Sequence, residues 1–190
     1  MAQSAAALCA RALITLGARP IASLDETGTE AMVCRRLYPG IRDALLSAHP
    51  WSFATAQARL PRLNAEPLAD FRYAYQLPHD FLRALSAGDG GSGRGLAYRI
   101  AAGRLHTDAE AVVLTYVFRP HEPDFPPFFD GALTARLAAD LCLPLTESTS
   151  RAEALARLAD DTIRRARQVD AQQDTPPRLR DFPLVEVRGA

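Results

Sequence analysis

Glycine-rich residues 88–95 are the first candidate for chemistry, because Gly88, Gly90 and Gly93 match the G-x-G-x-x-G pattern of dinucleotide-binding loops. Such a loop holds a pyrophosphate only where it follows a strand and opens a helix, whose N-terminus then faces the negative charge. Here the next residues, Leu96–Ile100, have the pattern of a strand. We therefore expect a mobile hairpin loop, which a neighbouring molecule could order, rather than a nucleotide site.

The histidines do not have the spacing of metal ligands. His49, His79, His106 and His121 fall in turns or at strand ends, and none has the i,i+4 helical partner of a zinc-binding pair. The run His121-Glu122-Pro123-Asp124 is rich in ligand atoms, but it is flanked by prolines and has no partner motif. We expect neither a metal site nor a cofactor.

Nucleophilic catalysis has no recognisable motif in this chain. Serine, histidine and aspartate are all present, but no nucleophile elbow occurs. The paired carboxylates Asp25-Glu26 and Asp160-Asp161 fit helix-capping or solvated positions. All 22 basic residues are arginine, which excludes a P-loop lysine, a Schiff-base lysine and a lysine general base. The sequence predicts a protein that is not an enzyme.

One dense basic patch, Arg164-Arg165-Ala166-Arg167, lies near the end of a predicted helix. Positive charge is favourable there because the helix dipole is negative at its C-terminus. Asp160, Asp161 and Asp170 largely neutralise the patch. Stabilisation of the helix end or a subunit contact explains it better than DNA binding, which remains the alternative.

Composition limits the class of protein. A chain of 190 residues with 48% hydrophobic residues suits one domain, or a domain with an inserted subdomain. The formal net charge of zero disfavours dedicated nucleic-acid binding. No apolar run is long enough for a membrane span, and the N-terminal residues lack a secretory pattern. Cys9, Cys34 and Cys142 are far apart and odd in number, which predicts reduced, mostly buried thiols in a protein assembled in a cytoplasm.

Two helices are expected before residue 50. The first spans residues 4–16, and Gly17 is placed to end it in a left-handed cap. Thr27 and Glu30 fit a capping box for the second, whose apolar stripe continues to Leu45. Pro39-Gly40 interrupts that stripe, so we expect a kink or a split into two helices.

Two further helices are expected after residue 120. Pro126-Pro127 suits the start of the third, and Pro144 is expected to end it. Arg136 and Asp140 form an i,i+4 pair on this helix. Ser150 and Glu153 fit a capping box for the fourth, which should extend to about Gln172.

Strand patterns fill the middle of the chain. Val112–Phe118 is β-branched or aromatic almost throughout, which is typical of a strand. The predicted strands are Ser52–Leu60, Arg72–Leu77, Phe81–Ser86, Leu96–Ile100, Arg104–Thr107 and Ala111–Phe118. His49-Pro50 stops the second helix, so Trp51 and Phe53 are expected to fill the joint between helices and strands.

These elements predict an α+β protein: a four-helix bundle, made of two N-terminal and two C-terminal helices, with an inserted antiparallel β subdomain. The expected divisions are residues 1–50 and 120–173 for the bundle, 51–119 for the β subdomain, and 174–190 for an extended C-terminal arm.

The order of several short motifs resembles one family. Six motifs follow one another along the chain: Leu16-Gly17-Ala18-Arg19-Pro20-Ile21, Arg42–Leu46, His49-Pro50-Trp51-Ser52-Phe53-Ala54, the aromatic strand before Leu77-Pro78-His79-Asp80, Leu114-Thr115-Tyr116, and Phe128-Phe129 with the following helix. Together they resemble tail tubular protein A, the head-to-tail adaptor of short-tailed bacteriophages, over nearly the whole chain to about residue 172.

The resemblance implies a structural role in a virion tail. Family members form a dodecameric ring beneath the portal, continue the DNA channel, and carry the nozzle protein and often the tail fibres. It implies portal and nozzle as partners, DNA that passes without sequence-specific binding, no membrane and no cofactor. The alternative is a nucleic-acid-binding packaging accessory protein that uses Arg164–Arg167; a small hydrolase is more distant.

The segment after Asp174 is expected to be an assembly arm. Pro176-Pro177 stiffens its base, and the residues beyond have strand-forming character without a partner strand nearby in sequence. The expected anchors are Phe182, Leu184, Val185 and Val187. Portal is the first expected partner, a neighbouring adaptor subunit the second, and a disordered tail the alternative.

Overall fold

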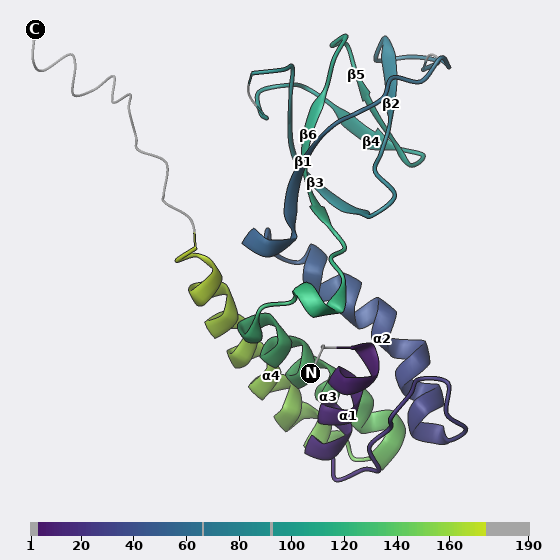
Figure 1. The fold of residues 1–190 in the computed structure, drawn as a ribbon, viewed down its shortest axis with the longest axis vertical. Coiled ribbons are helices and arrows are strands. Elements are labelled where there is room, and N and C mark those ends of the chain that lie inside the picture. The colour runs from purple at the N-terminus through teal and green to yellow at the C-terminus, as the bar shows by residue number, and fades with distance from the viewer. Residues whose placement is uncertain (1–3, 66, 92, 174–190) are drawn as a thin grey trace, which may run out of the picture.

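The fold was analysed in a computed structural model, which describes residues 4–65, 67–91 and 93–173. Helices gather at one end of an elongated molecule and strands at the other (Figure 1). The helices are α1 (Ala5–Thr15), α2 (Thr29–Ser47), α3 (Pro127–Thr146) and α4 (Thr149–Asp170). The strands are β1 (Thr55–Arg59), β2 (Tyr73–Gln76), β3 (Phe81–Gly88), β4 (Arg99–Ala101), β5 (Arg104–Thr107) and β6 (Val113–Phe118). The predicted α+β class is confirmed.

Helix α3 is central among the helices, packing most extensively on α4 and also on α1 and α2. It is hydrophobic on most of its circumference, which suits a helix with neighbours on several sides. Its buried residues meet those of α1 and α2 in one core, whose fully buried side chains include Leu8, Leu13, Leu46, Phe129, Leu133, Leu137 and Leu141. Cys9, Cys34 and Cys142 are free and buried, as expected.

Helix α1 begins and ends as its sequence predicts. The Ser4 hydroxyl accepts a hydrogen bond from the Ala7 amide, satisfying a donor that the first turn leaves unpaired. Gly17 follows the helix with φ of 65°, the left-handed geometry that glycine adopts without steric cost.

Helix α2 corrects two predictions. Its N-cap is Gly28, with no side-chain cap, so the Thr27–Glu30 capping box is wrong. The preceding turn is held instead by Glu26, whose carboxylate accepts from the amides of Ala22 and Ser23. The helix also continues through Pro39, so a split into two helices is wrong. Proline removes one backbone hydrogen bond, but buried residues before and after it keep both halves on the core.

The α3–α4 connection corrects two more predictions. Helix α3 starts at Pro127 as expected, but it continues past Pro144 to Thr146 and ends with Glu147 at φ of 54°. The N-cap of α4 is Ser148, whose hydroxyl accepts from the Arg151 amide, so the Ser150–Glu153 capping box is wrong. The connection is therefore a tight turn that keeps α4 against α3.

The strands form two three-stranded antiparallel sheets, ordered β1-β6-β3 and β2-β5-β4. Thr55 pairs with Val117 in the first sheet, and Tyr73 with Thr107 in the second. Both sheets share a core formed by Leu60, Tyr75, Leu77, Ala87, Leu105, Val112, Leu114 and Tyr116. All six predicted strands are present, β5 with the predicted bounds and the other five with one or both ends shifted. Ser52–Ala54 forms a 3-10 turn, η1, rather than the start of β1.

The glycine-rich segment connects β3 to β4 and lies partly against the first sheet. The hydroxyl of Ser86 donates to the Gly93 carbonyl at 2.7 Å, and that of Thr115 donates to the same carbonyl at 3.3 Å. The element after the segment is strand β4, not a helix. The segment therefore lacks the helix N-terminus that a dinucleotide site requires.

Within the described ranges, no helix is both long and apolar enough to cross a membrane.

Candidate functional site

Trp51 lies where the helices meet the first sheet, and its side chain is fully buried. Its indole N–H donates to the Leu45 carbonyl at 3.0 Å, which satisfies the one polar atom of the ring. The Phe129 ring lies edge-on at 5.2 Å between centroids, and Phe53 is 6.2 Å away. The structure therefore places Trp51 and Phe53 in one aromatic cluster at this junction, with rings from α3.

Asp170, the last residue of α4, also reaches this junction and is almost fully buried. Its carboxylate accepts from the Ser52 hydroxyl at 2.7 Å and from the Ser52 amide at 3.1 Å. The Nε2 atom of His49 lies 3.6 Å from the other side of the same carboxylate. Asp170 thus ties the end of α4 to the start of η1 and β1.

This trio has the residues of a catalytic triad but not its connections. In a triad the imidazole lies between the hydroxyl and the carboxylate, so that it can accept the hydroxyl proton. Here the carboxylate lies between Ser52 and His49. Burial, followed by the positive charge of Arg167, lowers the pKa of His49 and favours the neutral ring. The Asp170 carboxylate therefore holds the backbone and hydroxyl of Ser52 in place at the start of η1.

Sequence reasoning missed this role of Asp170, which it treated only as a charge that neutralises nearby arginines. One signal was available. An aspartate in the last turn of a helix opposes the helix dipole, so a hydrogen-bonding partner outside the helix would offset that cost.

A second set of polar contacts connects α2 to the exit from β6. Arg119, which follows β6, donates to the Asp43 carboxylate from both Nε and Nη2, the shortest contact being 2.6 Å. Arg42 donates to Asp43 at 2.9 Å and to Glu122 at 3.0 Å. Tyr38 donates to the same Glu122 oxygen at 3.1 Å. We call this set the α2–β6 ion-pair network; Glu122 begins the 3-10 turn η2 (Glu122–Asp124).

The network keeps its carboxylates charged. Burial alone would raise the pKa values of Asp43 and Glu122, but hydrogen bonds and nearby arginine charge lower both below their ordinary values. Burial, with the negative charge of Glu122, raises the pKa of Tyr38 and keeps its proton in place. Glu122 belongs to the run His121-Glu122-Pro123-Asp124, which is rich in potential metal ligands, but its carboxylate accepts hydrogen bonds from Arg42 and Tyr38. In the part of the chain that the structure describes, no group of three or more His, Cys, Asp or Glu is arranged to hold a metal.

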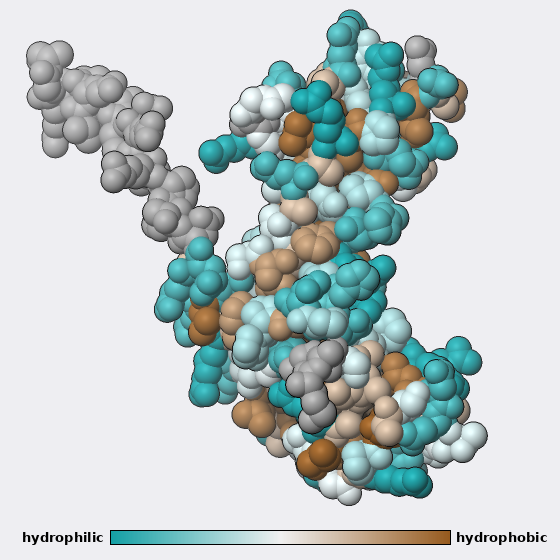
Figure 2. Space-filling view, in the orientation of Figure 1, coloured by the Kyte–Doolittle hydropathy of each residue, from teal (hydrophilic) through white to brown (hydrophobic). Residues whose placement is uncertain are grey.

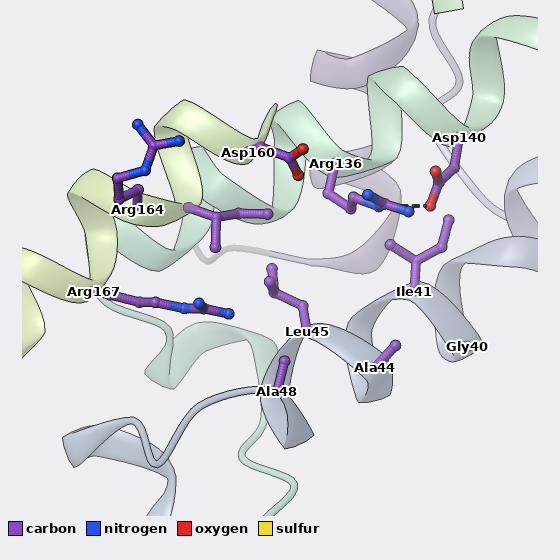
Figure 3. A pocket seen from close by; sticks show the side chains of 11 residues that line it. Gly40, Ile41, Ala44, Leu45, Ala48, Arg136, Asp140, Asp160, Arg164 and Arg167 are labelled. Carbon is purple, nitrogen blue, oxygen red and sulfur yellow. Dashed lines mark hydrogen bonds and ion pairs between the residues drawn. The ribbon is translucent and has the colours of Figure 1, made fainter. Parts of the chain in front are cut away.

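A groove with a cavity volume of about 540 Å³ lies between α2 and α4, with α3 behind it (Figure 3). We call it the α2–α4 groove. It forms because α4 packs on α3, while its contacts with α2 are few. Eleven residues line it: Gly40, Ile41, Ala44, Leu45, Ala48, Arg136, Asp140, Asp160, Ile163, Arg164 and Arg167.

Charged side chains of both signs surround an apolar floor in this groove. Arg136 pairs with Asp140 at 3.1 Å, as the i,i+4 spacing predicts, and Arg164 pairs with Asp161 at 3.0 Å. Asp160 and Arg167 have no ion pair within the described ranges, and the Arg167 Nε atom is buried without a hydrogen-bond partner. Figure 3 shows Arg167 extending across the groove toward α2.

The groove is lined by apolar and charged side chains, and its lining contains no serine, cysteine or histidine. Its size and its mixture of apolar and charged groups suit an amphipathic segment. The basic patch is divided there: Arg164 and Arg167 line the groove and Arg165 does not. The predicted anchors Phe182, Leu184, Val185 and Val187 lie outside the described residues.

Comparison with known proteins adds no family: no family model matches this chain, and no curated protein matches it. Function is therefore inferred from the residues themselves.

Proposed function

We propose that this protein is a structural head-to-tail adaptor of a short-tailed phage, forming a dodecameric ring between the portal and the tail nozzle. In this proposal the four helices act as one bundle, residues 51–119 form an inserted β subdomain, and residues 174–190 form an extended arm. The protein has no enzymatic activity; it is assembled in the host cytoplasm and resides in the virion tail. DNA passes through the ring without sequence-specific binding.

The observation that best supports this proposal is the double attachment between helices and strands. Asp170 joins α4 to the start of β1, and Arg119 joins the end of β6 to α2. Both chain crossings between the two ends of the molecule are therefore anchored by charged hydrogen bonds, which are stronger than neutral ones. A ring subunit needs this property, because its two ends must stay at a fixed spacing while they contact different partners.

Charge and surface also favour this role. The net charge is zero, so the chain as a whole has no excess of positive charge to retain DNA phosphates, and Arg42, Arg119, Arg136 and Arg164 are paired with carboxylates. Large exposed apolar side chains, such as Ile14, Met32, Leu143 and Leu158, are separate from one another in sequence. Figure 2 shows apolar residues interspersed among polar ones on the displayed face.

Electron microscopy with the portal tests the proposal. We expect the purified protein to be monomeric or weakly associated at low micromolar concentration, because most large apolar side chains of the described residues are buried or partly buried. On portal-bearing capsids it should form a ring, since a template raises the local concentration of subunits. A stable dodecamer without portal would contradict templated assembly. Portal-bearing capsids that never acquire a ring would overturn the adaptor function itself.

The alternative, a nucleic-acid-binding accessory protein that uses Arg164–Arg167, has less support. Arg164 is paired with Asp161, and Arg167 extends into the α2–α4 groove. Salt-dependent retention of DNA by the purified protein would favour the alternative.

A further inference from the structure

We propose that the α2–α4 groove binds residues 174–190 of a second copy of this chain. This inference rests on the proposed ring and names one contact between its neighbouring subunits. The groove gives the segment a specific place to bind, on an adaptor neighbour rather than on portal.

The shape of the groove suits a narrow chain segment. Gly40 and Ala44 of α2 and its C-cap residue Ala48 are spaced four residues apart, so they lie on one face and leave room beside Leu45 and Ile163. The face from Gly40 to Ala48 is about 12 Å long at the helical rise of 1.5 Å per residue. That length accommodates about four residues of extended chain.

The unpaired charges of the groove complement those of the segment. Asp160 and Arg167 lie on α4 about 10 Å apart along its axis and have no ion pair among the residues that the structure describes. The segment carries both signs close together, in Arg178, Arg180 and Asp181. Its apolar residues follow directly, and the four-residue stretch from Phe182 to Val185 matches the length of the groove floor, which Phe182, Leu184 and Val185 can cover.

The position of the segment favours a second copy over its own groove. The segment follows Gln173, near the end of the groove marked by Arg167 and Ala48. Pro176-Pro177 favours an extended backbone, which opposes an immediate reversal along α4. Residues 178–190 alone can span about 40 Å when extended, enough to cross to an adjacent subunit and still fill the groove.

A fluorescent peptide of residues 174–190 tests the groove as a receptor, using the full-length protein. We expect saturable binding, measured by fluorescence anisotropy, and no binding of a scrambled peptide. Ala44→Trp should weaken binding at least about tenfold because it fills the groove, as should Arg167→Glu, which reverses a charge that pairs with the segment. The matched control is Ala154→Trp, which places the same side chain on an exposed part of α4 outside the groove.

Charge reversal tests the proposed pairing. A peptide that carries Asp181→Arg should bind wild-type protein less tightly and recover affinity on Arg167→Glu protein. Equal loss with both proteins would overturn the pairing of Asp181 with Arg167. Binding unaffected by Ala44→Trp would overturn the groove as the site.

Photo-crosslinking identifies which copy supplies the segment. Phe182 is replaced by p-benzoylphenylalanine in a mixture of isotopically heavy and light full-length chains at high concentration. Crosslinks from position 182 to groove residues that join heavy to light chains support the proposal. Crosslinks only within one chain, or only outside the groove, overturn it. Ring formation on portal is measured separately, so the adaptor function can stand if this contact fails.

Discussion

At the scale of single residues, Trp51 contributes by packing and Asp170 by hydrogen bonding. Trp51→Ala should lower the free energy of unfolding by about 3–5 kcal/mol, because it leaves a cavity among the rings of Phe53 and Phe129 and unpairs the Leu45 carbonyl. Chemical denaturation measures the change, with Leu68→Ala, at a fully exposed position, as the control. An unchanged unfolding midpoint in the tryptophan variant would show that this cluster does not hold the junction.

At the scale of elements, the α2–β6 ion-pair network predicts a pH dependence. The pKa of Asp43 is lower in the folded protein than its ordinary value, so the network stabilises the fold above about pH 4 and loses that effect as pH falls through the folded pKa. Arg119→Gln should cost about 1 kcal/mol at pH 7, a small value because Arg119 is partly exposed.

The cost of Arg119→Gln should begin to shrink below about pH 4 and should vanish as pH falls through the lowered pKa of folded Asp43. Urea denaturation at pH 7, 5, 4 and 3 measures it. The matched control is Arg165→Gln, an exposed arginine without an ion pair among the described residues, which should show no such trend. A difference between wild type and Arg119→Gln that stays constant across this range would refute an electrostatic role for the network.

The elements also show what local sequence determines. Strand β6 was predictable because most of its residues are β-branched or aromatic and favour strands by themselves. Helix starts were less predictable, because either Ser148 or Ser150 could cap α4, and it is the Ser148 hydroxyl that accepts from the first turn. Pro39 and Pro144 were expected to disrupt helices, but tertiary contacts compensate for the lost hydrogen bonds.

The candidate site was the least predictable part. Asp170 and Ser52 are 118 residues apart in the sequence, and the pairing of Arg119 with Asp43 also links distant segments. The α2–α4 groove depends on how far α4 lies from α2, which no local pattern encodes. The Arg164–Arg167 patch was visible in the sequence, but the sequence did not show that Arg164 and Arg167 line one groove together with residues of α2.

At the scale of the whole molecule, the arm should be separable from the fold. Truncation after Asp174 removes none of the described core or junction contacts, so the melting temperature should not change. The truncated protein should fail to form rings on portal-bearing capsids, as seen by electron microscopy. Rings as frequent as those of the full-length protein would show that the arm is dispensable for assembly.

Asp170 also defines a mechanical path through the molecule. Only Ala171, Gln172 and Gln173 separate it from residue 174, and its carboxylate holds the Ser52 amide at the entrance to β1. Tension applied to residues 174–190 would therefore enter the first sheet directly, without first crossing the helical core. Such a load would change the hydrogen-exchange rate of the Ser52 amide. Exchange would slow if the load tightens the contact between Asp170 and Ser52, and it would become faster if the load pulls Asp170 away.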